Sequence, residues 1–329
     1  MATIELVMNG RRVGSSLSPY LKTLSYREAL DGEADVLEVT LQDAEGLFRS
    51  AWYPSRGMSM EATILDEYAA MELGSFEIDE IEYSVPPSEC KIKGNAIPGG
   101  STLKSVEKSR SWENVPLRAI ALDIATGAGL KLYYKAPEDP LIERAEQESE
   151  SDLKFLHRLC RDKGLALKMN DRQVIIFDIE EFEAALPSDV IVAGTSAVKR
   201  FSARSTLNEV YSRCEVKYKH GRKGELIEGS ASSGGLLSTV FGAKGRTLKV
   251  KKKVATKAEA DRLARKALKS ANRSETKAQM TLAGDMALRA GSTVQLSGFE
   301  VFDGKYLIQR ATHTVGASGY ETAIELTRC

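Results

Sequence analysis

The sequence predicts an α+β fold that is mainly β, in which two antiparallel β-barrel domains flank a small α+β middle domain. Three observations predict it: a hairpin phrase occurs near both ends, apolar residues alternate in both end regions, and their spacing becomes helical between them. Alternation along a strand leaves one face wet, which is typical of barrels and sandwiches. The expected domains are residues 1–98, 99–190 and 191–329.

The duplicated phrase is a strand, a loop and then Gly-x-aromatic-x-Ile. Gly57 precedes the first strand and residues 74–78 (GSFEI) close the phrase; Gly291 and residues 304–308 (GKYLI) repeat it. Internal repeats indicate a duplicated structural unit. The alternative is that a common way of leaving a hairpin arose twice by chance.

The first region also contains local strand signals. Asn9-Gly10 follows an alternating run and predicts a two-residue hairpin turn. After Ile78 the apolar phase moves to Ile81, Tyr83 and Val85. Such a shift exposes the buried face unless an extra residue is absorbed, so we expect a bulge near Asp79-Glu80.

The middle region reads as two helix–Gly–strand units. We expect Asn114 to cap a first helix that has Pro116 in its first turn and ends at Gly127. A second helix is expected over residues 149–164, with Ser149 and Asp152 in capping-box-like spacing.

In the last region, the Gly- and Ser-rich residues 229–245 are expected to form a flexible loop. A helix should follow over residues 256–272, beginning with Thr256 and Glu259 as a capping box. Its apolar side is thin, so we expect it on the outside of a barrel.

Composition narrows the class of protein. The 329 residues are 42% hydrophobic and 28% charged, which is ordinary for a globular chain, and no apolar run approaches the length of a membrane helix. The four cysteines are scattered without a CxxC pair, which favours reduced, structural thiols.

Charge is unevenly distributed although the net charge is zero. Residues 1–100 hold 17 acidic and 8 basic side chains, whereas residues 191–329 hold 12 and 25. A nucleic-acid surface over the basic segment 246–277, including Lys251, Lys252 and Lys253, is one explanation. The favoured one is that acidic and basic domains of neighbouring subunits pack together.

No enzyme signature is present. The motifs HExxH, GxSxG and the P-loop are absent, and three histidines form no pattern. Glu80 and Glu82 could imitate a glycosidase carboxylate pair, but a solvated strand face has the same pattern. We expect no catalytic residue, no cofactor and no metal.

Three segments, in this order, resemble the phage late control D family, the baseplate hub proteins of contractile tails. They are PSRG at 54–57 with GSFEIDEIE at 74–82, then SESDLKFLHRLCRDKGLALKM at 149–169, and GSTVQLSGFEVFDGKYLIQRATHTV at 291–315.

The resemblance implies a structural protein rather than an enzyme. It implies a homotrimer whose six tail-tube-like barrels form a pseudo-sixfold ring, with the hexameric tail tube on one face and a trimeric central spike on the other. The spike would be a separate polypeptide, with tape measure and baseplate wedge proteins as further partners and DNA as passing cargo. The location would be a virion tail, or a tail-like particle, assembled in the bacterial host cytoplasm.

Five residues are nominated for interfaces. Trp52 and Tyr53 are large aromatic residues in a loop-like stretch, and Lys251, Lys252 and Lys253 begin the basic run. Large exposed aromatic side chains are typical of protein interfaces.

Overall fold

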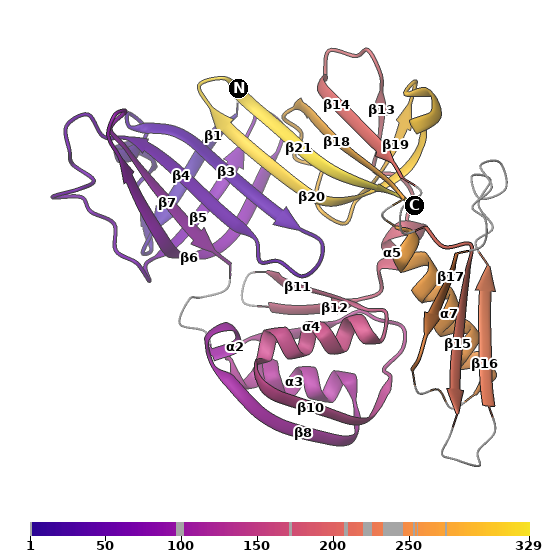
Figure 1. Cartoon of the computed structure of the whole chain (residues 1–329). Helices are drawn as coiled ribbons and strands as arrows, with labels where there is room; N and C mark the ends of the chain where they lie inside the picture. Colours follow the sequence, from indigo (N-terminus) through magenta and orange to yellow (C-terminus); the bar gives the residue numbers. More distant parts are fainter. Residues whose placement is uncertain are drawn as a thin grey trace. The chain divides into compact units, whose positions relative to one another are not determined.

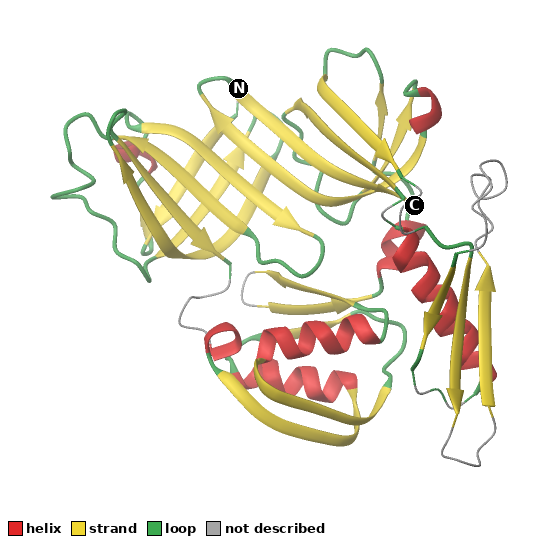
Figure 2. Ribbon diagram, viewed as in Figure 1, coloured by secondary structure: helices red, strands yellow, loops and turns green. Residues whose placement is uncertain are grey.

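The computed structural model describes residues 2–96, 102–170, 173–206, 210–219, 226–232, 246–252, 254, 256–273 and 275–329. The chain forms two compact units. Unit 1 comprises Met1–Phe201 and Gln279–Leu326, and unit 2 comprises Ser202–Ala278 and Thr327–Cys329 (Figure 1). Strands predominate, with helices in the middle region and in unit 2 (Figure 2), which confirms the predicted α+β, mainly β class.

The first part of unit 1 is a curled antiparallel sheet, which we call the first β-unit. Its strands pair in the order β3-β4-β7-β6-β5-β1-β2. They are β1 (Thr3–Met8), β2 (Arg11–Arg12), β3 (Leu21–Ala29), β4 (Val36–Gln42), β5 (Ser59–Leu65), β6 (Ala70–Ser84) and β7 (Glu89–Asn95); a short helix, α1 (Gly14–Leu17), follows β2.

Alternating apolar side chains from these strands fill one core. The Asn9-Gly10 hairpin is confirmed, since both residues have positive φ and Met8 pairs with Arg11. The bulge is confirmed as well, because the register of β6 with β7 shifts between Ile78 and Glu80.

The middle part of unit 1 contains α2 (Thr102–Ser105), β8 (Glu107–Pro116), α3 (Leu117–Gly127), β9 (Lys131–Tyr134), β10 (Leu141–Ser151), α4 (Asp152–Asp162), β11 (Ala166–Asn170), β12 (Gln173–Phe177) and α5 (Ile179–Ala184). The predicted helix–Gly–strand units are α3–β9 and α4–β11, and the strands join β12 in one small sheet. The paired strands β8 and β10 were not predicted.

Both predicted helix starts in this part need correction. Asn114 lies in β8 with a φ of 53°, and the N-cap of α3 is Pro116. The first amides of α3 donate instead to the Pro140 carbonyl and the Asp139 carboxylate. Ser151, rather than Ser149, caps α4 by accepting a hydrogen bond from the Lys154 amide at 3.4 Å.

The remaining strands of unit 1 form a second β-unit. They are β13 (Asp189–Val192), β14 (Val198–Ser205), β18 (Thr276–Ala283), β19 (Thr293–Ser297), β20 (Gly304–Gly316) and β21 (Gly319–Arg328), with a 3₁₀ turn at Glu300–Phe302; β14, β18 and β21 each run on into unit 2.

The second β-unit repeats the strand order of the first. The run β14-β18-β21-β20-β19-β13 matches β3-β4-β7-β6-β5-β1. One pairing departs from the predicted antiparallel arrangement, because β13 runs parallel to β19 whereas β1 runs antiparallel to β5.

Unit 2 is a three-stranded sheet covered by one helix. The sheet order is β16 (Leu226–Ser232), β15 (Arg213–Lys219), β17 (Thr247–Val250), and the helix is α7 (Lys257–Asn272). The capping box is confirmed, since the Thr256 hydroxyl accepts a hydrogen bond from the Glu259 amide at 3.2 Å. The helix was expected on the outside of a barrel. It packs instead on this three-stranded sheet, through Ala260, Ala264 and Leu268.

The predicted loop at 229–245 is wrong at its start. Residues 229–232 belong to β16, where Val216 pairs with Gly229; residues 233–245 lie outside the described part of the chain. Gly229 is required there by packing, because a Cβ atom would lie 2.3 Å from the Ala260 carbonyl carbon. Its place in the strand is therefore fixed by the close approach of α7.

We predict that Gly229→Ala destabilises unit 2 by about 1–3 kcal/mol, because the added methyl group must push α7 away from the sheet. Hydrogen exchange of the α7 amides measures the effect. The matched control is Gly127→Ala in α3, where a Cβ meets nothing within 4 Å and the change should be neutral or slightly stabilising. Wild-type protection of α7 in Gly229→Ala would contradict the packing argument.

Candidate functional site

The duplicated phrase adopts the same backbone geometry in both β-units. The Gly57 amide donates to the Ile78 carbonyl at 2.8 Å, and the Gly291 amide donates to the Ile308 carbonyl at 2.9 Å. Both glycines have positive φ, 84° and 94°.

The pairing next to these glycines also matches. In the first β-unit Met60 pairs with Phe76, and in the second Val294 pairs with Tyr306. Met60 lies three residues after Gly57, and Val294 lies three residues after Gly291. The shared turn, hydrogen bond and register support a duplicated structural unit rather than a chance recurrence.

The two β-units are joined by strand pairing. The second half of β20 pairs antiparallel with β3 of the first β-unit, from Arg310 opposite Ala29 to Gly316 opposite Thr23. One continuous sheet therefore runs through the first and the second β-unit. This joint is the candidate site, because it shows how one copy of the repeat attaches to another.

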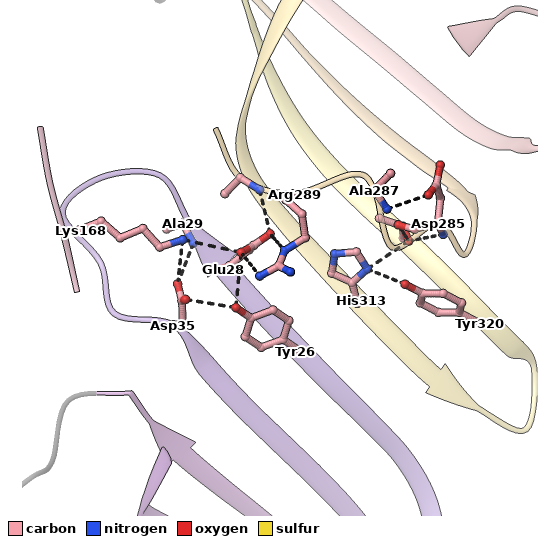
Figure 3. A network of polar contacts seen from close by, with 12 residues as sticks. Tyr26, Glu28, Ala29, Asp35, Lys168, Asp285, Ala287, Arg289, His313 and Tyr320 are labelled. Atoms are coloured by element: carbon pink, nitrogen blue, oxygen red, sulfur yellow. Dashed lines mark hydrogen bonds and ion pairs between the residues drawn. The ribbon is translucent and has the colours of Figure 1, made fainter. Parts of the chain in front are cut away.

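A buried ion pair locks this joint (Figure 3). Glu28 on β3 is 1% exposed, and its carboxylate accepts hydrogen bonds from Arg289 Nε at 2.8 Å and from Arg289 Nη2 at 3.1 Å. The Ala290 amide donates to the same carboxylate at 2.8 Å. Arg289 and Ala290 directly precede Gly291, so the duplicated turn of the second β-unit is anchored on a strand of the first.

The pair continues to the middle part of unit 1 through Lys168 on β11. Its ammonium lies 3.6 Å from Glu28 and 3.7 Å from the buried Asp35, whose carboxylate also accepts from the Tyr26 hydroxyl at 3.1 Å (Figure 3). Two carboxylates and two cations thus occupy one buried cluster. The two carboxylates depend on these partners, because either one would be a buried charge if it were left unpaired.

The charges shift the pKa values of both acids. Burial alone would raise the pKa of Glu28, but the hydrogen bonds and positive charges of Arg289 and Lys168 outweigh it and lower that pKa below its ordinary value. Burial raises the pKa of Asp35 to about 6; Lys168 opposes this shift and Glu28 adds to it. Glu28 is therefore the firmly ionised member.

His313 extends the contact across the joint. It lies directly opposite Tyr26, and the two rings stack with centroids 6.2 Å apart. Its Nδ1 lies 2.8 Å from the Tyr320 hydroxyl (Figure 3). Burial lowers the pKa of His313 to about 4 and raises that of Tyr320 to about 12, so both side chains are neutral at pH 7.

The nominated aromatic residues lie elsewhere on the first β-unit. Trp52 and Tyr53 are 46% and 56% exposed, and both line a cavity of about 780 Å³. Trp52 packs edge-on against Tyr20 and Phe48, with ring centroids about 6 Å apart. Their role in an interface remains a prediction.

The nominated lysines belong to unit 2. Lys251 is exposed and Lys252 half-buried, both just after β17, while Lys253 lies outside the described residues. The sequence did not predict a role for Glu28, Asp35, Lys168 or Arg289. The available signal was Glu28 itself, which continues the inward phase of Leu24 and Tyr26 on a strand.

The division into units also corrects the expected charge pattern. Unit 2 holds 20 Lys and Arg against 7 Asp and Glu, a net charge of +13, and unit 1 holds 26 against 39, or −13. Residues 191–201 and 279–326 of the second β-unit hold five of each sign. The basic charge therefore belongs to unit 2 and not to a second barrel.

Comparison with known proteins gives a family and a shared fold. The family model described as Phage tail baseplate hub (GPD) matches residues 97–319. The probable baseplate hub protein of Escherichia phage P2 is 25% identical, over 98% of this chain and 92% of the phage protein.

Two solved structures are similar over the whole chain. A 43 kDa tail protein of prophage MuSo2 from Shewanella oneidensis has a TM-score of 0.76 at 16% identity, covering 100% of this chain and 98% of its own. An E. coli type VI secretion component, described as structurally similar to T4 phage tail proteins, has a TM-score of 0.57 at 13% identity, covering 100% and 77%.

We predict that Arg289→Met destabilises unit 1 by about 3–5 kcal/mol, because it leaves the ionised Glu28 buried with the Ala290 amide and, as its one remaining cation, the more distant Lys168. Urea unfolding followed by tryptophan fluorescence reports on unit 1, since Trp52 and Trp112 both lie there. Glu28→Leu combined with Arg289→Met should regain most of the loss. The control, Arg27→Met at an exposed position of β3, should cost under about 1 kcal/mol; a loss of that size in Arg289→Met would refute the lock.

We expect the buried His313 to reduce the stability of unit 1 in acid. Its pKa of about 4 lies below the ordinary 6.5, so its contribution is complete above pH 6.5 and declines as the pH falls toward 4. We predict that the wild-type protein loses up to about 3 kcal/mol more than His313→Gln over that window. The comparison with the variant isolates His313, because the raised pKa of Asp35 changes stability in the opposite direction. NMR titration of the imidazole checks the cause, and a midpoint near 6.5 would disprove it.

Proposed function

The chain belongs to the phage tail baseplate hub family, and we propose that three copies form a ring with pseudo-sixfold symmetry in a tail baseplate. The observation that carries this proposal is the duplication of one six-stranded arrangement within a single continuous sheet. Two similar units per chain give six similar units per trimer. The match of the phage P2 hub protein over nearly the whole chain supports the same role.

Such a ring solves a symmetry mismatch. A surface of six similar β-units can present nearly equivalent contacts to a hexameric tail tube. Elements that occur once per chain, such as the middle part and unit 2, occur three times and can match a trimeric central spike. Closed rings satisfy all their contacts, which favours a trimer over an open chain of subunits.

The ring would enclose the channel through which DNA passes as cargo. Its partners would be the tail tube protein, the central spike protein, and the tape measure and wedge proteins beside them. Trp52 and Tyr53 are proposed as contacts to the tube or the spike, because they add exposed aromatic surface to a cavity. The site would be structural, within a virion or a related injection particle assembled in the host cytoplasm.

The net charge of +13 on unit 2 favours a second candidate function, nucleic-acid binding through residues 246–277. Retention of DNA that falls steeply with salt concentration would distinguish it from an assembly role, since released counterions make phosphate contacts salt-dependent.

Among the described residues, no helix has the length and apolar content needed to cross a membrane.

We predict a mass of three chains of 36.0 kDa by light scattering, either for the purified protein or after addition of tube and spike proteins. Tyr53→Ser should weaken binding of a partner while leaving the trimer intact, because its side chain is mostly exposed. The matched control is Tyr68→Ser, because Tyr68 is also an exposed tyrosine, 89% accessible to solvent. A monomer that ignores both partners would refute the hub.

A further inference from the structure

The strand β14 is the counterpart of β3 at the level of single residues. The Gln42 amide donates to the Tyr20 carbonyl at 2.7 Å, and the Ala283 amide donates to the Ala197 carbonyl at 2.8 Å, so Tyr20 corresponds to Ala197. Continuing from there aligns LKTLSYRE with VKRFSARS, with Lys, Ser and Arg at matching positions. The partly or fully buried residues also coincide, with Leu24 and Tyr26 matching Phe201 and Ala203.

The strand β6 is likewise the counterpart of β20. Ile78 and Ile308 make the same hydrogen bond to the duplicated glycine. Beyond them the next apolar residue of the inward series lies three positions on in both strands, at Ile81 in one and Ala311 in the other. Glu82 therefore corresponds to Thr312.

Each copy of the repeat thus has two equivalent edges, but only one pair of edges meets within the chain. The second half of β20 pairs with β3. The equivalent half of β6, Glu80–Ser84, pairs with β7 on one side, and in the described part of the chain no strand pairs with its other side. The strand β14 ends the strand order, so one of its edges is also unpaired there.

We propose that these two edges pair between subunits, so that β6 of one copy adds to β14 of the next in the register of the β20–β3 joint. This inference rests on the proposed ring and specifies how its subunits attach. Transferring the register places Glu82 opposite Arg204 and Tyr83 opposite Ala203. Outward residues meet outward ones and inward residues meet inward ones, as a continuous sheet requires.

Charge favours this pairing over the others. The β6 edge carries Glu80 and Glu82, whereas the β14 edge carries Arg200 and Arg204, all exposed. Two β6 edges or two β14 edges would place like charges together, which disfavours self-pairing. Unlike edges attract, and the resulting contact is head-to-tail, the type that generates rings.

The joint is tested by cysteine pairs in the full-length chain, with the exposed Cys329 changed to Ser. Directly opposed residues on antiparallel strands have Cα atoms about 4.5–5.5 Å apart, which a disulfide can span. We expect Glu82→Cys with Arg204→Cys to form linked species up to the trimer under mild oxidation. The control pair is Glu61→Cys with Arg204→Cys. It should not link, because Glu61 lies on β5 rather than on the β6 edge.

Charge reversal gives a second readout. Glu82→Arg should weaken assembly by at least about tenfold, and adding Arg204→Glu should restore it, since the pair is exchanged rather than removed. Glu61→Arg is the matched control with no expected effect.

The outcomes separate this inference from the hub itself. If the wild-type protein is a trimer but the cysteine pair at positions 82 and 204 does not link and charge reversal has no effect, the strand joint is overturned and the hub stays in place. Linked chains that exceed three copies without closing support the joint and overturn the closed trimer. A protein that stays monomeric and unlinked with tube and spike proteins present overturns both.

Discussion

The buried carboxylate of Glu28 connects three segments of unit 1. A carboxylate that is 1% exposed would cost several kcal/mol if it were unpaired, and here Arg289, the Ala290 amide and Lys168 share its compensation. These partners come from the second β-unit and from the middle part. One buried charge therefore fixes how three segments, widely separated in sequence, pack together. An apolar residue at position 28 could fill the same space, but it would not specify the same neighbours.

The continuous sheet imposes a second constraint. Because β20 pairs with both β19 and β3, its two halves must satisfy two registers, and the phase shift after Ile308 changes the inward face between them. The first β-unit has the same shift after Ile78, where the second register has no partner in the described chain.

The sequence was sufficient for features determined by neighbouring residues. The Asn9-Gly10 turn, the bulge after Ile78 and the Thr256 capping box are local chemistry, and the mainly β class followed from alternation. Asn114 failed as a cap because Asp139 and the Pro140 carbonyl, more than 20 residues away, satisfy the first amides of α3. Residues 229–232 read as a loop because their glycine serves a contact with α7, which composition does not reveal.

The Glu28–Arg289 lock was out of reach for a related reason. An inward Glu on a strand can be recognised as unusual, but its partner lies 261 residues later in a turn whose sequence is unremarkable. Pairing between such positions is decided by topology, and topology depends on how the two copies join. The duplicated phrase pointed to that topology without giving its contacts.

The connection between β3 and β4 differs from its counterpart between β14 and β18. In the first β-unit it is six residues long, and its Gly32 amide bonds the Leu167 carbonyl of the middle part. In the second the chain runs from β14 through unit 2 and back along β18, and the Thr206 amide meets the Glu275 carbonyl at 2.9 Å. The two ends of unit 2 are therefore already in contact at its base. A segment attached in this way can be gained, lost or exchanged during evolution at little cost to the sheet, so this point of the fold can diversify while the strand order of the two β-units stays the same.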